Sequence, residues 1–229
     1  MASQNPSFLL LLLLVFFTHT ILTLSQNPPN KIPFTCIPQL NPCKSLLYQH
    51  NQLTKNNISS LYSVDISQIQ TITHRNKQDH LVTVPCSCQN VNNTIAYFYD
   101  TIYPVKLGDT FPNVSDQFYS GQAWDEGSRF KAGMNAHMDL LCGCAKSDSQ
   151  IMVTYTVQEK DTLSDIADLL SAKVSEIEDV NKVLLQKQGF IEVGWVLFVP
   201  MYKNGVPSTP APAPSPEIPH PNSSTSSLL

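Results

Sequence analysis

The 229-residue sequence has few charged side chains and no excess of positive charge. Asp, Glu, Lys and Arg make up 14% of its residues, and 14 basic against 18 acidic side chains give a formal net charge of −4. Nucleic-acid-binding proteins typically carry clustered basic residues, so the slight excess of acidic residues argues against a nucleic-acid partner. Apolar residues make up 42% of the chain, which is enough for a core. A neutral, hydroxyl-rich partner such as a glycan suits the remaining polar surface.

The sequence also lacks the short motifs of common hydrolases. Neither His-Glu-x-x-His nor Gly-x-Ser-x-Gly occurs in it. Carboxylate pairs such as Asp125 with Glu126, or Glu176 with Asp179, are more typical of a solvated surface than of a shielded acid/base pair. We therefore predict no catalytic residues, no cofactor and no metal site, and we expect a binding protein rather than an enzyme.

Long apolar runs are missing as well. The segment Phe8 to Phe17 is too short for a comfortable membrane span and is followed by polar residues, which is typical of a secretory signal peptide at residues 1–25. An uncleaved anchor is the alternative. Residues 206–229 contain Pro-Ala repeats and indicate an extended stalk. We expect truncation just before a membrane segment at the extracellular face of the plasma membrane, or else a secreted, apoplastic protein.

Six cysteines stand in a pattern that favours disulfides. Four of them form two Cys-x-Cys pairs, and residues two apart on an extended chain point the same way, so a bond within either pair would be strained. Each pair should therefore tie different parts of the chain together, which leaves several pairings open. Zinc is disfavoured by the spacing and by an oxidising compartment. The cysteines are Cys36, Cys43, Cys86, Cys88, Cys142 and Cys144.

The cysteines divide the chain into three segments of similar length, which suggests an internal repeat. The clearest segment runs from Tyr155 to Pro200. It begins with a short strand and continues with a helix after Asp161-Thr162, which looks like a helix N-cap. A second helix follows, and then a strand over Gly194 to Val199 that Pro200 should end. Strand, helix, helix and strand predict a small α+β unit.

The other two segments are less regular. In the first, Leu46 to Gln49 and Leu81 to Val84 suggest strands, the second of which should end at Pro85. Ile58, Leu61 and Tyr62 share one helical face, and Ile66 and Ile69 suggest the start of another helix. In the next, residues 97–105 alternate like a strand and residues 138–141 suggest another, without a clear second helix between them.

The third segment resembles the LysM carbohydrate-binding module, in which a Tyr-x-Val strand, an Asp-Thr-Leu turn, an Ile-Ala pair, a mid-module Asn and a final Leu-x-Val-Pro recur. One departure is Lys160, where the family usually has Gly. The matching residues are Tyr155, Val157, Asp161, Thr162, Leu163, Ile166, Ala167, Asn181, Gly194, Leu197, Val199 and Pro200.

With both Cys-x-Cys spacers, residues 36–202 resemble the ectodomains of plant LysM receptors, which carry three LysM units, a stalk, a membrane anchor and often a kinase. The stretches LLYQHN, LVTVPCSC, YFYDTIYPVK and YSGQAW are most similar to the receptors for bacterial exopolysaccharide in legume symbiosis. The resemblance implies units at residues 36–86, 88–142 and 153–202, with βαββ, βαβ and βααβ orders. It also implies the disulfides Cys36–Cys88, Cys43–Cys144 and Cys86–Cys142.

The function implied is a cell-surface glycan receptor for a microbial polysaccharide, with another LysM receptor as a potential partner and with any kinase beyond this chain. One alternative is a co-receptor or secreted decoy for chitin, whose oligomers consist of N-acetylglucosamine. Another is a cell-wall-attached scaffold that does not signal.

In LysM modules the loop after the first strand and the loop before the last form a shallow glycan groove. The resemblance therefore implies glycan-binding residues in two units, although helix capping is the alternative for Asp161 and Asp109 and turn geometry is the alternative for Gly108. Trp195 is expected to pack, whereas Trp124 is a candidate for stacking on a sugar or for a contact between units. The third unit offers Gln158, Glu159, Lys160, Asp161 and Thr162 facing Lys187, Gln188, Gly189 and Phe190, and the second offers Lys106, Leu107, Gly108, Asp109 and Thr110 facing a loop near Asn135.

Four Asn-x-Ser/Thr sequences are candidate N-glycosylation sites in a secreted chain. They lie at Asn57, Asn92, Asn113 and Asn222.

Overall fold

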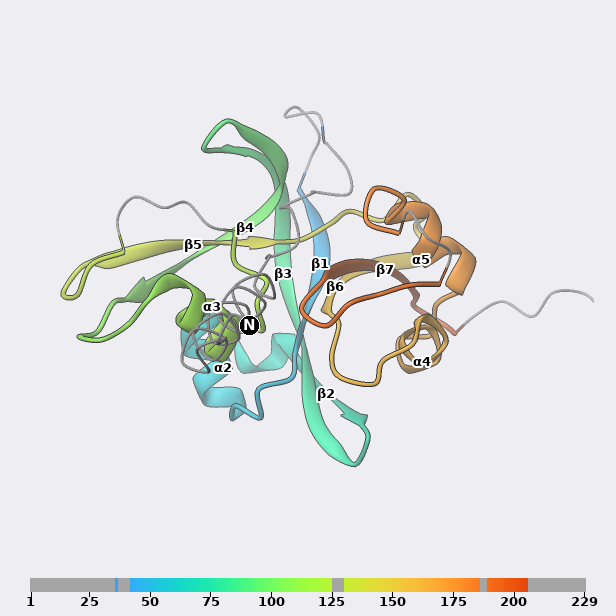
Figure 1. The fold of residues 1–229 in the computed structure, drawn as a ribbon, viewed down its shortest axis with the longest axis horizontal. Helices are drawn as coiled ribbons and strands as arrows, with labels where there is room; N and C mark the ends of the chain where they lie inside the picture. The colour runs from blue at the N-terminus through green and yellow to red at the C-terminus, as the bar shows by residue number, and fades with distance from the viewer. Residues whose placement is uncertain (1–35, 37–41, 125–129, 186–188, 206–229) are drawn as a thin grey trace, which may run out of the picture.

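The computed structural model describes residues 36, 42–124, 130–185 and 189–205. The signal peptide and the stalk predicted from the sequence lie outside these residues, as does Asn222. The fold is α+β, and seven strands form one sheet flanked by short helices (Figure 1). The strands are β1 (Cys43–Gln49), β2 (Ile69–His74), β3 (Lys77–Val91), β4 (Thr94–Pro104), β5 (Asn135–Leu141), β6 (Gln150–Thr156) and β7 (Val196–Tyr202). The helices are α2 (Lys55–Tyr62), α3 (Phe111–Tyr119), α4 (Leu163–Leu169) and α5 (Val174–Val180), with a short 3₁₀ turn at Ile66–Gln68.

Three units follow one another along the chain. The first contains β1, α2, β2 and β3, the second β4, α3 and β5, and the third β6, α4, α5 and β7. These are the βαββ, βαβ and βααβ orders that the family resemblance implies. The boundary expected between the first two units falls inside β3, because this long strand continues from one unit into the next.

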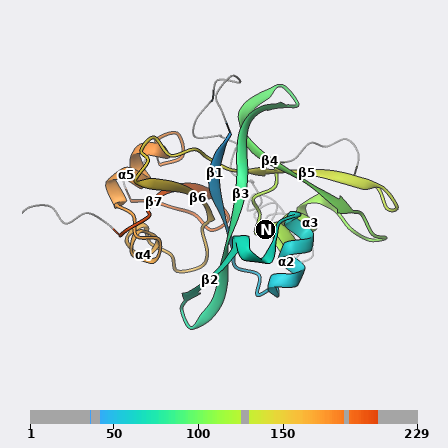
Figure 2. The same cartoon turned by 180° about the vertical axis from the view of Figure 1, so that it is seen from behind.

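One continuous sheet joins the units, in the order β5-β4-β3-β1-β6-β7 with β2 beside β3. The third unit is attached by a parallel pairing of β6 with β1, in which Leu46 lies opposite Val153. The second unit is attached by the antiparallel pairing of β3 with β4. The view from behind shows the β2–β3 hairpin projecting beyond the rest of the sheet (Figure 2).

Two large apolar cores flank the sheet. One lies beneath α2 and α3 and includes Ile58, Tyr62 and Tyr119, all fully buried. The other fills the third unit, and Tyr48 of β1 belongs to it with its ring 4.7 Å from that of Tyr155. A first-unit side chain thus completes the core of the third unit. Within the part of the chain that the structure describes, no helix is long and apolar enough to cross a membrane.

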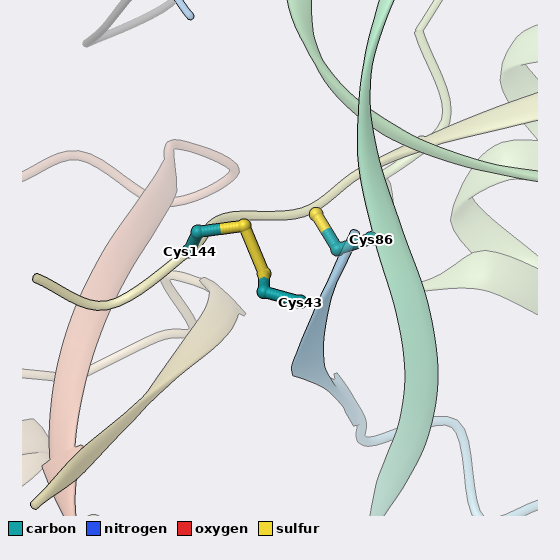
Figure 3. Close-up of side chains that lie close together, drawn as sticks. All are labelled: Cys43, Cys86 and Cys144. Atoms are coloured by element: carbon teal, nitrogen blue, oxygen red, sulfur yellow. A yellow bond between two sulfur atoms is a disulfide. The ribbon is translucent and has the colours of Figure 1, made fainter. Parts of the chain in front are cut away.

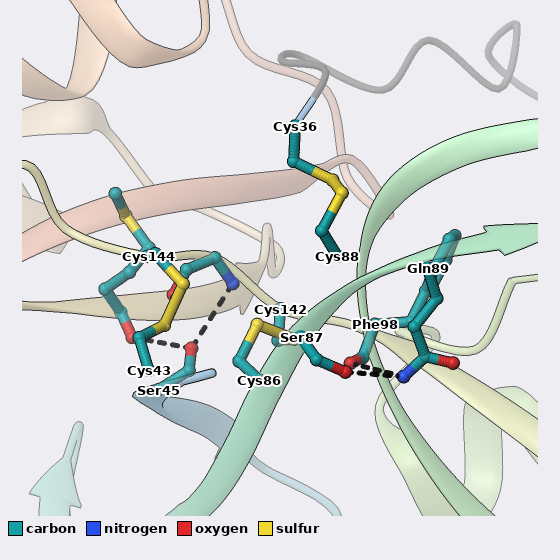
Figure 4. Close-up of a disulfide and its surroundings, with 12 residues drawn as sticks. Cys36, Cys43, Ser45, Cys86, Ser87, Cys88, Gln89, Phe98, Cys142 and Cys144 are labelled. Atoms are coloured by element: carbon teal, nitrogen blue, oxygen red, sulfur yellow. Dashed lines mark hydrogen bonds between the residues drawn. A yellow bond between two sulfur atoms is a disulfide. The ribbon is translucent and has the colours of Figure 1, made fainter. Parts of the chain in front are cut away.

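The three disulfides are Cys36–Cys88, Cys43–Cys144 and Cys86–Cys142, the same pairs that the resemblance implies. The sulfur atoms of Cys43, Cys86 and Cys144 lie within 4.8 Å of one another (Figure 3). They belong to two neighbouring disulfides (Figure 4), so none of them is a free thiolate that could ligate a metal. These two bridges tie β1 and β3 to the segment that links the second unit to the third.

Two predictions from the first segment are wrong. Ile66 and Ile69 do not start a helix, because Ile69 is buried opposite Val82 and begins β2 after a single 3₁₀ turn. Pro85 does not end its strand. On one edge of β3 the pairing with β2 stops at Val82 and the pairing with β4 starts at Ser87, so the missing N–H of Pro85 removes no ladder bond on that edge.

Candidate functional site

A buried carboxylate fixes the loop after the first strand of the third unit. The hydroxyl of Tyr155 donates to Oδ2 of Asp161 at 2.7 Å, and the backbone N–H of Gln158 donates to the same oxygen at 2.8 Å. Thr162 is the residue that caps α4, through a bond from the N–H of Asp165 to its hydroxyl. The role of Asp161 is therefore to hold the turn and not to cap the helix. Burial and, secondarily, the bond to Asp161 raise the pKa of Tyr155 above its usual value.

The second unit repeats this arrangement. Tyr103 donates its hydroxyl to Oδ2 of Asp109 at 2.9 Å, and the N–H of Lys106 donates to that oxygen at 2.8 Å. Burial first, and then this bond, raises the pKa of Tyr103 to about 12. Gly108 has a φ of +91°, and Lys160 occupies the equivalent left-handed position of the third unit at +66°. Turn geometry thus accounts for Gly108 and makes Lys160 a strained substitute.

A residue that the sequence analysis did not single out connects the third-unit loop to the first unit. Arg75 lies at the tip of the β2–β3 hairpin. It donates to the carbonyl of Glu159 at 2.5 Å and to that of Lys160 at 2.8 Å, and its guanidinium lies 3.0 Å from Oδ1 of Asp161. The loop expected to bind glycan is therefore supported from outside its own unit.

Around this contact the three units form an open pocket of about 630 Å³, which we call the junction pocket. It lies within the size range of small-molecule sites. The first unit contributes His50 and the hairpin, and the second contributes residues at the end of α3. The third contributes the 156–160 loop with Val193 and Gly194. No single unit would form this pocket alone.

Three buried polar atoms of the lining have no hydrogen-bond partner among the described residues. They are Nδ1 of His50, Oδ1 of Asp79 and Oγ1 of Thr156. The other oxygen of Asp79 accepts from the hydroxyl of Tyr48 at 2.7 Å. Buried polar groups are nearly always paired, so these three atoms indicate a place where polar ligand atoms or water can bind.

The electrostatics of the junction pocket are mixed. Burial lowers the pKa of His50 and raises that of Asp116, so the imidazole is held towards its neutral form. Arg75 and Lys77 bring positive charge, and Asp79 and Glu159 bring negative charge. The lining therefore alternates donors and acceptors without a strong excess of either sign, which suits a partner rich in hydroxyl groups.

The structure divides the predicted third-unit residues. Gln158, Glu159 and Lys160 line the junction pocket. Asp161 and Thr162 stabilise the loop and the helix start, as described above. Gly189 and Phe190 do not belong to the lining. The ring of Phe190 is half exposed and lies 6.2 Å from that of Trp195, edge to face. Lys187 and Gln188 lie outside the described residues.

The predicted second-unit residues form a separate, exposed loop. The loop is tied to the turn before β5 by backbone bonds between Val105 and residues 133 and 134. Leu107 at its tip is 95% exposed. Lys106, Gly108 and Asp109 build the turn, and Thr110 is the N-cap residue of α3. None of these residues lines the junction pocket.

Both tryptophans pack against other side chains of the protein. Trp124 is partly buried and packs against a small cluster that includes Phe98 of the second unit and Phe198 of the third, with its ring 6.3 Å from that of Phe98. This favours the contact between units over a role as an exposed sugar-stacking side chain. Trp195 packs on the third-unit core as expected, although its Nε1 is buried and lacks a hydrogen-bond partner within the described ranges.

Sequence reasoning missed the first-unit half of the junction pocket. His50, Arg75 and Asp79 come from a segment whose LysM pattern is weak. The one usable signal was the stretch His74-Arg75-Asn76-Lys77 between two alternating runs, since Asn in a short polar link is typical of a hairpin turn. Arg75 and Asn76 do adopt left-handed conformations there. Among the glycosylation candidates, Asn57, Asn92 and Asn113 are exposed.

Comparison with known proteins agrees with this architecture. Residues 155–200 match the LysM domain model. A relative, LysM domain receptor-like kinase 3 of Arabidopsis thaliana, is 27% identical over 142 residues, which cover 57% of this chain and 21% of the relative. This chain therefore spans about a fifth of that relative's length.

Two solved structures share the fold. The crystal structure of the ectodomain of a receptor like kinase has a TM-score of 0.57 at 18% identity and covers 73% of this chain and 96% of its own. The crystal structure of the LYK3 ectodomain has a TM-score of 0.51 at 16% identity and covers 75% and 95%. At these identities the likeness concerns the fold.

Proposed function

From a chain that contains a LysM domain at residues 155–200 and has the fold of LysM receptor ectodomains, we propose a glycan-binding function centred on the junction pocket. In this proposal the chain is the extracellular part of a cell-surface receptor, and its ligand is a microbial polysaccharide. Signalling would belong to other parts of the receptor or to a second LysM receptor that acts with it.

The observation that carries the proposal is the set of unpartnered, buried polar atoms in residues that line the junction pocket. Nδ1 of His50, Oδ1 of Asp79 and Oγ1 of Thr156 come from different strands and loops, yet all three residues line one cavity. A sugar offers closely spaced hydroxyl groups that both donate and accept hydrogen bonds. Leaving such buried groups unpaired costs about 1–3 kcal/mol each, so a ligand that pairs them gains affinity.

The pocket is built for binding rather than for catalysis. Its carboxylates are committed to the protein or open to solvent. Asp79 accepts from Tyr48, and Glu159 is exposed. A glycosidase needs two carboxyl groups on opposite sides of a sugar, with their pKa values set apart by shielding. Asp116 is the one carboxyl of the lining with a raised pKa, and no matched second group accompanies it within the described lining.

A specific observation supports a second candidate ligand, oligomers of N-acetylglucosamine. The second-unit loop presents an exposed Leu107 beside the left-handed Gly108. An exposed apolar side chain on a fixed turn offers a contact for the CH face of a sugar. A chitin co-receptor or secreted decoy would use this loop, whereas the lead proposal uses the junction pocket. A scaffold attached to the cell wall would need neither site.

Binding measurements on point variants separate these functions. A glycan array and calorimetry on the disulfide-bonded chain would compare bacterial exopolysaccharide fragments with chitin oligomers. His50→Ala removes a pocket side chain whose Nδ1 has no partner among the described residues. His137→Ala is a matched control, because His137 of β5 is exposed and pairs with Asp100 of the neighbouring strand β4. We expect His50→Ala to weaken exopolysaccharide binding about tenfold, as for one lost buried hydrogen bond.

Each alternative outcome has a clear meaning. Binding of chitin oligomers alone, weakened by Leu107→Asp and unaffected by His50→Ala, would replace the lead proposal with the chitin function. Failure to bind any carbohydrate would leave the cell-wall-attached scaffold as the remaining function. Equal effects of His50→Ala and His137→Ala would remove the junction pocket from the proposal.

In the same proposal, Asn57, Asn92 and Asn113 carry N-glycans, because each acceptor is exposed on the described surface. Enzymatic deglycosylation followed by peptide mass spectrometry tests these sites one by one.

A further inference from the structure

A second cavity, of about 530 Å³, lies on the first unit and has a different chemical character. We call it the hairpin pocket. Its walls are the turn before α2, the first residues of that helix and the β2–β3 hairpin. The charged groups in its lining are all basic, namely Lys55 and Lys77, with His80 beside them. A lining without a carboxylate is unexpected on a chain with a net charge of −4.

The charge of Lys55 acts on the buried ring of His80. His80 is only 7% exposed, and Nδ1 of its ring has no hydrogen-bond partner in the described chain. Its pKa is lowered by burial first and by the charge of Lys55 second. The ammonium of Lys55 therefore disfavours the charged form of the imidazole. An anion bound between the two groups would pair with the Lys55 ammonium and would favour the protonated form of the imidazole.

The nearest carboxylate does not neutralise the pocket. Asp79 precedes His80 in β3, so their side chains point to opposite faces of the hairpin, and Asp79 lines the junction pocket instead. There its carboxylate accepts a hydrogen bond from Tyr48 and lies 3.7 Å from His74. The charge of Asp79 raises the pKa of His80, but by less than burial and Lys55 lower it.

The start of α2 adds to the positive field. Thr54 and Lys55 line the hairpin pocket at the N-terminus of this eight-residue helix. Helix N-termini favour anions because their first N–H groups point outward and carry partial positive charge. One proton of the Lys55 ammonium is used on the carbonyl of Ile69 at 2.9 Å, which holds the side chain in place and leaves two N–H donors.

The remaining lining suits a sugar that carries the anion. Gln52, Thr71, Asn76 and Gln78 offer neutral amide and hydroxyl groups, which can pair with ring hydroxyls. Lys77 lines both the hairpin pocket and the junction pocket, so a chain of sugars could extend from one to the other around the hairpin.

We propose that the hairpin pocket binds the carboxylate of a uronic acid residue in an acidic glycan. The inference rests on the proposed glycan-binding function and adds a ligand class to it. Acidic glycans with this chemistry occur in microbial exopolysaccharides and in the pectin of plant cell walls, and the experiment must distinguish the two.

The first experiment uses the monosaccharide, so that it does not depend on the polymer. Sodium glucuronate is titrated into the labelled, disulfide-bonded chain, and the imidazole resonances of His80 are followed by NMR, with glucose and sodium phosphate as comparisons. We expect a saturable shift with glucuronate and none with glucose. A tighter saturable shift with phosphate, or equal shifts with glucuronate and glucose, would overturn the assignment to a uronate.

A pair of charge variants locates the effect. Gln78→Glu places a negative charge in the lining at an exposed position, and Gln70→Glu places the same charge at an exposed position of the same hairpin that lines neither pocket. We expect Gln78→Glu to raise the glucuronate Kd roughly fivefold and Gln70→Glu to leave it within roughly twofold. Equal responses would place the anion elsewhere.

The second experiment identifies the source of the carboxylate. Acidic exopolysaccharide fragments, their carboxyl-reduced forms and oligogalacturonides are compared in calorimetry. Binding that is lost on carboxyl reduction supports the inference for a microbial ligand, and binding of oligogalacturonides alone supports it for a plant ligand. Undiminished binding after reduction would overturn the inference while the proposed function stands. A glucuronate shift without binding of any oligomer would contradict the proposed function alone.

Discussion

Arg75 and Asp161 form an ion pair that connects the first unit to the third, with Nη2 of the arginine 3.0 Å from Oδ1 of the aspartate. The aspartate side chain is fully buried, whereas the arginine is 40% exposed. The same carboxylate fixes the third-unit loop through its other oxygen. The shape of the candidate glycan-binding loop thus depends on a residue in the most irregular unit.

Replacement of Arg75 should loosen this contact. We expect Arg75→Ala to lower the free energy of unfolding by about 1–3 kcal/mol, because a buried carboxylate and two carbonyls lose a charged donor. Arg75→Lys should restore only part of this, since an ammonium cannot reproduce the planar fork of a guanidinium. Urea denaturation monitored by circular dichroism measures both, with the exposed Lys131→Ala as control. A loss of stability no larger than that of the control would show that the ion pair does not connect the units.

The equivalent turns of the second and third units allow a reciprocal exchange. Lys160→Gly should stabilise the chain by about 0.5–1 kcal/mol, because Lys160 occupies a left-handed conformation that glycine adopts without strain. This net value already allows for the larger conformational entropy that glycine loses on folding. Gly108→Lys should destabilise it by about 1 kcal/mol, since Gly108 has a φ of +91° although a Cβ there would meet no atom within 4 Å. Thermal unfolding of the two single variants tests the pair, and shifts of the same sign would refute the argument from backbone conformation.

The sequence predicted the third unit well because its signals are local. The two helices lie where the spacing of apolar residues placed them. Both strands are present but longer than predicted, because β6 begins at Gln150 and β7 continues through Pro200 to Tyr202, so Pro200 does not end it. The spacing of apolar residues and the helix caps are local signals, because each involves residues only a few positions apart in the sequence. The mid-module Asn181 was likewise visible in the pattern, although its role was not.

The candidate site could not be predicted to the same extent because its parts meet only through tertiary structure. Gln158, Glu159 and Lys160 were singled out and do line the junction pocket. His50 and Arg75 come from a unit whose pattern is weak, and the parallel pairing of β1 with β6 brings that unit beside the third. Sequence spacing carries no information on such a contact between distant strands.

Asn181 should be a structural residue of the third unit. Its side chain is fully buried, donates to the carbonyls of Ile177 and Phe198 at 2.7 Å each and accepts from the N–H of Phe198 at 2.9 Å. We expect Asn181→Leu to lower the free energy of unfolding by about 2–4 kcal/mol, because the backbone groups of β7 would remain buried without partners. Guanidinium denaturation measures the change. The helix variant Glu178→Gln, at a partly exposed position, is the control, and a loss below 1 kcal/mol for Asn181→Leu would contradict the assignment.

Stability should fall as the pH drops through the region of the ordinary histidine pKa, and His50 should contribute to this. Burial lowers the pKa of His50, with a further lowering by His74, while Asp79, Asp161 and Asp116 raise it. Above pH about 6.5 the imidazole is neutral in both states and contributes no pH dependence. Below it the unfolded chain binds a proton that the folded protein resists, so the unfolded state is stabilised relative to the folded state until the lower, folded pKa is reached. His80 acts in the same direction, because burial lowers its pKa too.

The variant His50→Asn isolates this contribution, because all other titrating groups are shared with the wild type. We expect the stability of the wild type to decrease more steeply than that of His50→Asn as the pH is lowered from 7.5 to 5.5, measured by urea denaturation at each pH. Above pH 7 the two proteins should show parallel curves. A steeper decrease in the variant, or a difference confined to alkaline pH, would mean that the folded protein favours the charged imidazole of His50, and the neutral histidine assigned to the junction pocket would then be wrong.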